Sequence, residues 1–392
     1  MKYRKMGSLP WQVSALGFGC MRLPSRGFLR GVDEKKAVEI IRLGIDKGIN
    51  YLDTAWVYHL GQSEKVIGLA LKDGYREKVR IATKLPMILM READAFERYL
   101  NQQLERLQIG CIDVYLLHGL NQGNFAKVKR MNLMDKMEKA REEGKIKHIG
   151  FSFHDTLPVF REIIDYYPWD MTQVQYNYMD ATVQASDEGL KYAHAKGIAV
   201  VVMEPLKGGQ LSRPPQEALD VMKAAPVQRT PVDWALQYVW NRPEVACLLS
   251  GMGTRKMVEE NCASADASGA GTLSAAEIRV VEQLAAIYRK NIAVPCTACG
   301  YCMPCPSGVD IPQNFALLNN KTGAATADFQ GKVRQWLLTR NYRKLAKSKK
   351  DLPKKNNRGG AALCTRCNAC IPKCPQKIMI PDELEKVKAA FR

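Results

Sequence analysis

Residues 50–58 read NYLDTAWVY, a short apolar run of strand character that ends in an acid, Asp53, and leads to a tyrosine, Tyr58. Similar runs recur along the chain, and amphipathic helical stretches such as 34–47 and 131–142 lie between them. This alternation is typical of parallel βα units. The eight candidate strands are residues 15–20, 51–54, 79–83, 112–117, 148–152, 171–175, 198–203 and 246–250.

Eight strand–helix units over about 260 residues fit a closed (β/α)8 TIM barrel better than an open, doubly wound sheet. An open sheet of the dinucleotide-binding type would carry Gly-x-Gly-x-x-Gly after its first strand, and residues 17–22, GFGCMR, lack the third glycine. We therefore predict an α/β fold with a (β/α)8 TIM barrel over residues 1–285.

Four polar side chains follow three consecutive strands of this barrel: Asp53 and Tyr58 the second, Lys84 the third and His118 the fourth. Barrel active sites are built at the carboxyl ends of the strands. A tyrosine can act as an acid when a nearby cation brings its pKa, ordinarily about 10, closer to neutrality, and a lysine held by a carboxylate is such a cation. Each residue alone is more often a solvated, capping or core group, so the joint placement is what indicates acid–base chemistry.

Three motifs carry a resemblance to a known family. Residues 50–58, together with Gly61-Gln62-Ser63-Glu64 and Ile67-Gly68, resemble the signature of the aldo-keto reductase superfamily. Residues 81–84, IATK, and 113–118, DVYLLH, resemble its next two motifs. The resemblance covers about residues 1–285.

This resemblance implies roles for the four strand-end residues. Tyr58 would be the general acid, Lys84 and Asp53 the pair that tunes it, and His118 the residue that orients the substrate carbonyl. The implied reaction is reduction of an aldehyde or ketone by NADPH or NADH.

The resemblance also assigns the nicotinamide end of the cofactor. In IGFS, residues 149–152, the serine would hold the carboxamide, and a glutamine of the sixth strand would reach the same amide. Where the family usually has Asn next, this chain has Phe153, and a methionine stands in place of the tyrosine that stacks on the ring in many members. The expected contacts are Ser152, Gln173, Met203, Pro205 and Leu206.

Residues 250–256, SGMGTRK, resemble the loop and helix start that bind the adenosine phosphate of the cofactor in this family. Arg255 and Lys256 favour a 2′-phosphate, but Met257 stands where many members carry an arginine for it, so both NADP and NAD remain open. The expected contacts are Gly251, Gly253, Arg255, Lys256, Glu260 and Asn261.

Eight of the 12 cysteines form two short runs near the C-terminus. The second run has the C-x2-C-x2-C-x3-C-P spacing of a bacterial ferredoxin, and the first is one residue shorter before its last cysteine. Because the fourth cysteine of each run ligates the other cluster in two-cluster ferredoxins, we predict a ferredoxin-like domain over residues 286–392 with two [4Fe-4S] clusters that share ligands crosswise. A four-cysteine zinc site is the alternative. The runs are Cys296, Cys299, Cys302 and Cys305, and Cys364, Cys367, Cys370 and Cys374.

The net charge of +18 is concentrated in one segment, since residues 321–358 hold 12 Lys and Arg against two acids. It belongs to a basic helical insert predicted at about 318–360. Such a segment is either a solvated face or a dock for an acidic electron carrier such as ferredoxin or flavodoxin. Aromatic spacing typical of nucleic-acid binding is missing, and no apolar run is long enough for a signal peptide or a membrane span. We therefore expect a cytoplasmic protein.

Two functions remain open at this point. The first is reduction of a small carbonyl substrate, or oxidation of the alcohol, with the clusters structural or exchanging electrons with a carrier. The second is an electron-transfer or redox-sensing subunit whose barrel binds a small molecule without turning it over. Hydride transfer moves two electrons and a cluster moves one, so a direct relay needs an intermediary such as flavin, for which the sequence shows no signature.

Overall fold

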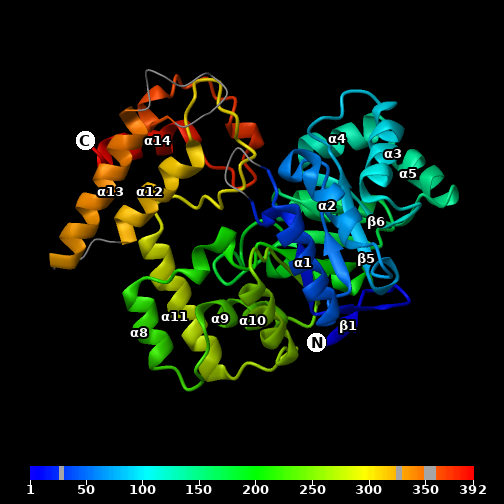
Figure 1. Ribbon diagram of the computed structural model, residues 1–392, viewed down its shortest axis with the longest axis horizontal. Coiled ribbons are helices and arrows are strands. Elements are labelled where there is room, and N and C mark those ends of the chain that lie inside the picture. Colours follow the sequence, from blue (N-terminus) through cyan, green and yellow to red (C-terminus); the bar gives the residue numbers. More distant parts are fainter. Residues whose placement is uncertain (26–30, 324–328, 348–358) are drawn as a thin grey trace. The chain divides into compact units, whose positions relative to one another are not determined.

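The structure, a computed structural model, describes residues 1–25, 31–323, 329–347 and 359–392 (Figure 1). The chain divides into two compact units. The first comprises Met1–Pro205 and Val232–Ser274, and the second comprises Leu206–Pro231 and Ala275–Arg392. The second unit thus includes a segment from the middle of the chain. The division into domains at residues 285 and 286 remains a prediction from the sequence.

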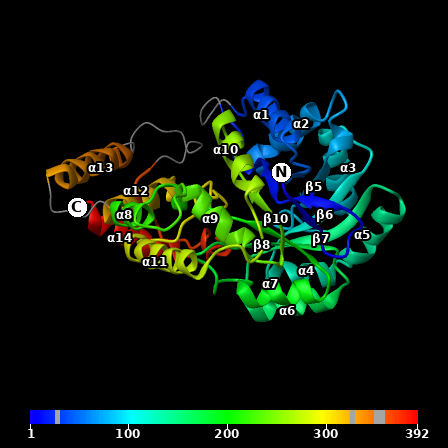
Figure 2. The ribbon, with the colours of Figure 1, turned by 90° about the horizontal axis from the view of Figure 1, so that it is seen from below.

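The first unit is built on a closed barrel of eight parallel strands, in the order β10-β3-β4-β5-β6-β7-β8-β9 (Figure 2). Every predicted strand is present, and all but one differ from the prediction by one to three residues at one or both ends, so the predicted (β/α)8 architecture is confirmed. The strands are β3 Leu16–Gly19, β4 Tyr51–Asp53, β5 Arg80–Leu85, β6 Ile112–Leu120, β7 Ile146–Phe153, β8 Met171–Gln175, β9 Ala199–Met203 and β10 Val245–Ser250.

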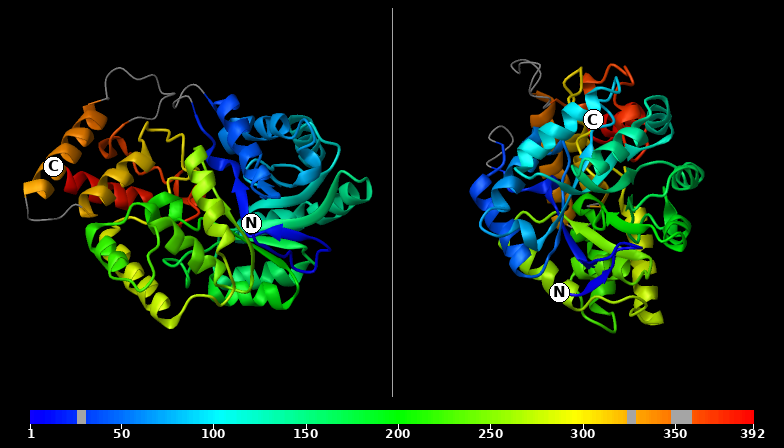
Figure 3. Two further views of the ribbon diagram at one scale, coloured as in Figure 1. Left: turned by 60° about the horizontal axis from the view of Figure 1, so that its bottom comes forward. Right: turned by 90° about the vertical axis from the view of Figure 1, so that its right-hand side faces the viewer.

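Helices lie outside the strands of this barrel (Figure 3). The helix expected over residues 131–142 is shorter than predicted, because Asn132 adopts a left-handed conformation (φ 47°) and separates two helices. The helices are α1 Glu34–Asp46, α2 Gln62–Ala70, α3 Ala95–Leu107, α4 Gln122–Arg130, α5 Leu133–Glu142, α6 Leu157–Tyr166, α7 Ser186–Ala195, α9 Pro231–Trp240 and α10 Arg255–Asp266.

An antiparallel hairpin of β1 (Tyr3–Lys5) and β2 (Gln12–Ser14) precedes the barrel. Val13 of this hairpin and Met6, which follows β1, are buried in one cluster with barrel residues such as Tyr51 and Ala199, which begin β4 and β9. The hairpin therefore covers the amino-terminal end of the strands, and the carboxyl-terminal end remains for a site.

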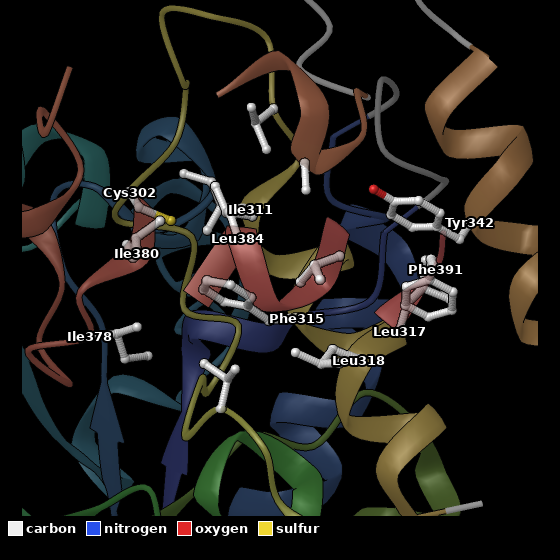
Figure 4. Packing of buried hydrophobic residues seen from close by; sticks show 14 residues of the cluster. Cys302, Ile311, Phe315, Leu317, Leu318, Tyr342, Ile378, Ile380, Leu384 and Phe391 are labelled. Atoms are coloured by element: carbon white, nitrogen blue, oxygen red, sulfur yellow. The ribbon is translucent and has the colours of Figure 1, made fainter. Parts of the chain in front are cut away.

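The second unit consists of helices and two cysteine-bearing loops around its own apolar core (Figure 4). Phe315, Leu318, Leu384 and Phe391 belong to this core, and α13 lies inside the predicted basic insert. Residues 324–328 and 348–358 of that insert fall outside the described residues. The helices are α8 Gln216–Lys223, α11 Ala275–Asn291, α12 Ile311–Gly323, α13 Phe329–Lys347 and α14 Ile380–Ala390.

Short 3-10 helices complete both units. They are η1 Cys20–Arg22, η2 Tyr58–Gly61, η3 Arg76–Lys78, η4 Lys207–Ser212, η5 Ala361–Leu363 and η6 Ile371–Lys373.

Candidate active site

The two-residue period of a strand brings the predicted catalytic residues to one end of the barrel. Each follows a buried interior residue of its own strand by two positions: Asp53 follows Tyr51, Lys84 follows Ala82 and His118 follows Leu116. Side chains two apart point to the same face of a strand. The three polar groups therefore enter the barrel interior at its carboxyl end, where the apolar layer stops.

Lys84 is the centre of this group. Its Nζ donates hydrogen bonds to Oδ1 and Oδ2 of Asp53 at 2.8 and 2.7 Å and to the carbonyl oxygen of Thr54 at 2.8 Å. Both charged side chains are buried. Burial lowers the pKa of Lys84 and raises the pKa of Asp53, and in each case the charge of the partner opposes the shift.

Tyr58 is brought to Lys84 by the turn that follows β4. The phenol oxygen lies 3.4 Å from Lys84 Nζ, and that nitrogen is 4.9 Å from the centre of the tyrosine ring. The next two residues, His59 and Leu60, have φ of 50° and 55°, an uncommon conformation for side-chain-bearing residues that turns the chain sharply after Tyr58. A nearly buried phenol thus has an ammonium as its neighbour.

His118 completes the predicted group of four. Its ring meets the ring of Tyr58 edge-on, with 5.9 Å between the ring centres and 84° between the planes. Burial, and then the charges of Lys84 and His154, hold the pKa of His118 well below its usual value. The imidazole is therefore neutral at pH 7 and can donate one hydrogen bond from whichever nitrogen carries the proton.

The predicted nicotinamide contacts lie on the strands that close the barrel opposite this group. Ser152 Oγ accepts a hydrogen bond from the Gly119 amide at 2.7 Å, and Gln173 Nε2 donates to the sulfur of Met203 at 3.7 Å. Pro205 is buried after β9. Leu206 belongs to the second compact unit, so the structure does not place it relative to the others.

One atom in this region lacks a partner. Gln173 Oε1 is buried, and within the described part of the chain it accepts no hydrogen bond. A buried acceptor without a donor costs about 1–3 kcal/mol. The amide NH2 group of a nicotinamide carboxamide is a donor of the kind that this oxygen lacks, so the residues present fit the cofactor.

The predicted phosphate contacts lie in the loop after β10 and in the first seven residues of α10. Thr254 caps this helix, and its hydroxyl accepts the Met257 amide at 3.2 Å. The loop before it is compact, since a Cβ at Gly251 would lie 3.1 Å from the Cβ of Arg22. Gly253 is half-buried in the same loop. Amide groups at the start of a helix favour a bound phosphate.

The charged residues of this helix start are all exposed and engaged with acids. Arg255 contacts Glu39 at 3.1 Å and Glu259 at 3.5 Å, and Lys256 contacts Glu260 at 3.6 Å. Asn261 is buried, and its side chain donates to the hydroxyl of Ser250 at 3.0 Å. Asn261 thus ties the helix to β10, while Arg255 and Lys256 lie at the surface in ion pairs.

The cysteine runs meet in the second unit as two groups of four. One pocket is lined by Cys296, Cys299 and Cys302 of the first run and by Cys374 of the second, with Phe315 and Ile380 among its apolar neighbours. Burial and these three neighbouring thiols raise the pKa of Cys302. No group of His, Cys, Asp or Glu side chains within the described residues is arranged to hold a single metal ion, and the four thiols instead line a pocket.

The other four thiols form the second group. Burial raises the pKa of Cys370, and the thiols that add to this effect are Cys305 of the first run and Cys364 and Cys367 of the second. In each group, three cysteines come from one run and the fourth comes from the other. This is the crosswise pattern that the sequence spacing predicts for two clusters.

Comparison with known proteins identifies both parts of the chain. Residues 15–285 match the model of the aldo/keto reductase family, which is more than half of the chain. The chain belongs to the aldo/keto reductase family. Residues 295–379 match the 4Fe-4S dicluster domain, so this reductase carries a C-terminal iron–sulfur domain of that class.

The relatives of this aldo/keto reductase family member match about two thirds of its chain or more. It is 29% identical to L-galactose dehydrogenase from Arabidopsis thaliana over 284 residues, which cover 67% of this chain and 88% of the relative. The aldo-keto reductase AKR11C1 from Bacillus halodurans superposes with a TM-score of 0.61 at 28% identity, covering 72% of this chain and 96% of that one. An aldo/keto reductase from Klebsiella pneumoniae, solved in complex with NADP and acetate, gives 0.59 at 25% identity and covers 72% of this chain and 95% of its own.

Behind the candidate active site, a buried network that the sequence did not reveal fixes the strand of Lys84. Gln103 Nε2 contacts the Lys84 carbonyl oxygen at 3.2 Å and Glu64 at 2.6 Å, and Glu64 also accepts from Thr83 at 2.7 Å. Tyr115 donates to Gln103 at 2.7 Å. The sequence singles out Glu64, because it belongs to the 61–64 motif. It does not single out Gln103, which lies inside an amphipathic helix.

A second network lies beside His118. His154, at the end of β7, pairs with Gln184 at 3.2 Å, and Gln184 contacts Gln175 at 3.3 Å. Burial lowers the pKa of His154 to about 4. This side of the site therefore offers neutral polar groups beside His118.

Among the helices described, none is long and apolar enough to cross a membrane.

Proposed function

We propose that this protein reduces the carbonyl group of an aldehyde or ketone with NADPH or NADH, and that Tyr58 is the general acid. The observation that carries the proposal is a single buried group of three side chains. Lys84 Nζ contacts both the carboxylate of Asp53 and, at 3.4 Å, the phenol oxygen of Tyr58.

The proton step follows from this arrangement. The phenol hydrogen of Tyr58 passes to the carbonyl oxygen of the substrate, and the ammonium of Lys84 stabilises the phenolate that is left. Asp53 and the Thr54 carbonyl oxygen fix the direction in which this ammonium points. His118, neutral at pH 7, donates a hydrogen bond to the same carbonyl oxygen and orients it towards Tyr58.

The cofactor, when bound, supplies the hydride that adds to the carbonyl carbon. We assign Ser152, Gln173 and Met203 to its nicotinamide end, and the start of α10 to its phosphates. Exposed Arg255 and Lys256 would favour a 2′-phosphate. The Klebsiella pneumoniae relative, solved with NADP, supports NADP as the cofactor here too.

For the C-terminal domain we propose two [4Fe-4S] clusters, each held by three cysteines of one run and one of the other. The pocket lined by Cys296, Cys299, Cys302 and Cys374 supports the first group. A cluster, when bound, gives or accepts one electron at a time. All 12 cysteines are free thiols, as ligation of this kind requires, and this fits the reducing environment of the cytoplasm.

The test uses anaerobically purified protein, a panel of simple aldehydes and ketones, and NADPH oxidation as the readout. We expect turnover by the wild type and a loss of about 10²–10⁴-fold in kcat for Tyr58→Phe. The Kd for NADPH should be unchanged in this variant, because the lost hydroxyl acts on the substrate. Undiminished turnover by Tyr58→Phe would remove the role proposed for Tyr58.

The same experiment tests the alternative. If the wild type binds NADPH tightly but turns over no carbonyl or alcohol in the panel, the barrel acts as a binding module. The protein would then be an electron-transfer or redox-sensing subunit.

A further inference from the structure

We propose that one face of α13 is the docking surface for a small acidic protein that carries single electrons, and that this carrier exchanges them with the cluster nearest to α13. We call this surface the basic–aromatic face. The inference rests on the proposed clusters of the second unit. The face consists of Val333, Trp336, Leu337, Arg340, Arg343 and Lys344.

These six residues form one stripe along the helix. Their spacings of three, four and seven residues place them on the same side of an α-helix. Trp336 is 60% exposed, Leu337 45% and Val333 40%. The guanidinium of Arg340 lies 5.6 Å from the centre of the Trp336 ring, so the indole is held against a cation at the surface.

The opposite side of α13 packs into the core of the second unit. Leu338, Tyr342, Leu345 and Ala346 face this core, and the ring of Tyr342 stacks on Phe391 with 4.5 Å between centres (Figure 4). The exposed apolar side chains are therefore not explained by the folding of this unit. Exposed clusters of Trp and Arg are typical of protein interfaces.

The inner side of α13 touches the segment that leads into the second cysteine run. The phenol of Tyr342 is hydrogen-bonded to the backbone of Ala361. A Cβ at Gly360 would lie 3.1 Å from the Cα of Ala346, so this backbone packs closely against the helix. Ala361–Leu363 is η5, and Cys364 follows it directly. A protein on the outer face of α13 would be one helix away from a cluster ligand.

Charge indicates the kind of partner. Between residues 329 and 347 the sequence has six Lys and Arg and no acid. Arg340, Arg343 and Lys344 are exposed on the stripe itself. Such a face attracts an acidic protein over long range and speeds its association, and the apolar residues give the contact its short-range part.

Electron counting makes a one-electron carrier the fitting partner. Hydride transfer in the barrel moves two electrons together, whereas a cluster moves one, so the electrons of the clusters come from or go to another molecule. In the proposed step the reduced carrier loses one electron and the oxidised cluster gains it. No bond forms or breaks, and the reverse step is balanced in the same way.

The test measures binding of an acidic ferredoxin to the anaerobically purified full chain, by titration calorimetry at low and high salt. We expect the triple variant Arg340→Glu/Arg343→Glu/Lys344→Glu to raise the Kd about tenfold or more at low salt. Trp336→Ala should raise it several-fold at both salt concentrations, because the indole contact is not ionic. Iron content should stay at the wild-type value in both variants.

The matched control makes the same change of net charge on the barrel. Lys35, Lys65 and Lys72 are exposed on α1, on α2 and directly after α2. The triple variant with glutamate at these positions has the same net charge as the α13 variant but keeps the basic–aromatic face. If docking depends on that face and not on net charge, this control should bind ferredoxin within about twofold of the wild type.

A second readout follows the electron. Reduction of the clusters by reduced ferredoxin should slow in the α13 variants, while reduction by dithionite, which needs no docking surface, should not. Equal ferredoxin binding by the α13 variant and the barrel control would overturn the proposal. So would binding of anionic vesicles or single-stranded RNA to this face without any binding of ferredoxin. A protein that lacks iron but still binds ferredoxin through α13 would instead contradict the proposed clusters.

Discussion

Lys84 and Asp53 form a buried ion pair in which one nitrogen contacts both carboxylate oxygens, at 2.7 and 2.8 Å. Each charge is tolerated in the interior because the other is present. The Thr54 carbonyl oxygen accepts a further hydrogen bond from the ammonium, so the nitrogen has a fixed position beside Tyr58. The pair therefore holds the ammonium where the proposed acid–base role of Tyr58 requires it.

Removing one partner of this pair should be more harmful than removing both. We expect Lys84→Met to lower the free energy of unfolding by about 3–5 kcal/mol, because the Asp53 carboxylate stays buried and unpaired. The double variant Lys84→Met/Asp53→Leu should recover a large part of this loss while remaining inactive. Urea unfolding of the single and double variants checks this. Additive losses would mean that the two side chains do not depend on each other.

Much of the barrel could be predicted because parallel strands buried on both faces give short apolar runs of recognisable length. The same regularity placed Asp53, Lys84 and His118 at strand ends. The cysteine runs were recognisable because cluster ligation requires fixed spacing. In each case a local structural requirement fixes which residue types occur at which spacing along the chain.

The rest depends on contacts between distant segments. The Thr54 carbonyl oxygen belongs to the backbone, so no residue type reveals that it accepts from Lys84. The burial of Gln103 could not be predicted, because a polar residue in an amphipathic helix is ordinarily solvated. The break at Asn132 was also hidden, since the residues on both sides favour helix.

His154 should make stability depend on pH. Its pKa is about 4 in the folded protein and about 6.5 in the unfolded chain, so between these values only the unfolded chain is protonated. The contribution is complete above pH 6.5 and is lost as the pH falls towards 4. Because His154 is partly exposed, we expect a loss of roughly 1–2 kcal/mol between pH 7.5 and pH 5.

The matched variant for this prediction is His154→Gln, which keeps a polar group beside Gln184 but does not titrate. Between pH 7.5 and pH 5 the wild type should lose roughly 1–2 kcal/mol more unfolding free energy than the variant does. Titrating groups other than the neighbouring His118 cancel in the difference. A difference that stays constant from pH 7.5 to pH 5 would show that His154 is freely protonated in the folded protein.

Gln173 should matter to the cofactor more than to the fold. Its Oε1 is a buried acceptor without a donor in the described structure, while its side chain also hydrogen-bonds the buried Asp53 carboxylate, so Gln173→Leu removes one unfavourable group and one favourable contact. Because these two effects oppose each other, we expect the stability to stay within about 1 kcal/mol of the wild type, together with NADPH binding weakened by roughly two- to tenfold. Fluorescence titration and thermal unfolding of the same preparation measure both. Equal NADPH affinity would mean that Gln173 does not contact the nicotinamide.

Paired cysteine variants distinguish crosswise ligation from ligation within each run. If Cys302 and Cys374 hold the same cluster, the double variant Cys302→Ser/Cys374→Ser damages only that cluster, and iron and sulfide each fall by about half. The matched double variant Cys302→Ser/Cys305→Ser then damages both clusters and loses nearly all of the iron. Ligation within each run predicts the opposite result for both proteins. Anaerobic iron and sulfide analysis of the two variants distinguishes the two ligation schemes. Because each variant replaces two thiols, a difference between them cannot come from the number of thiols removed.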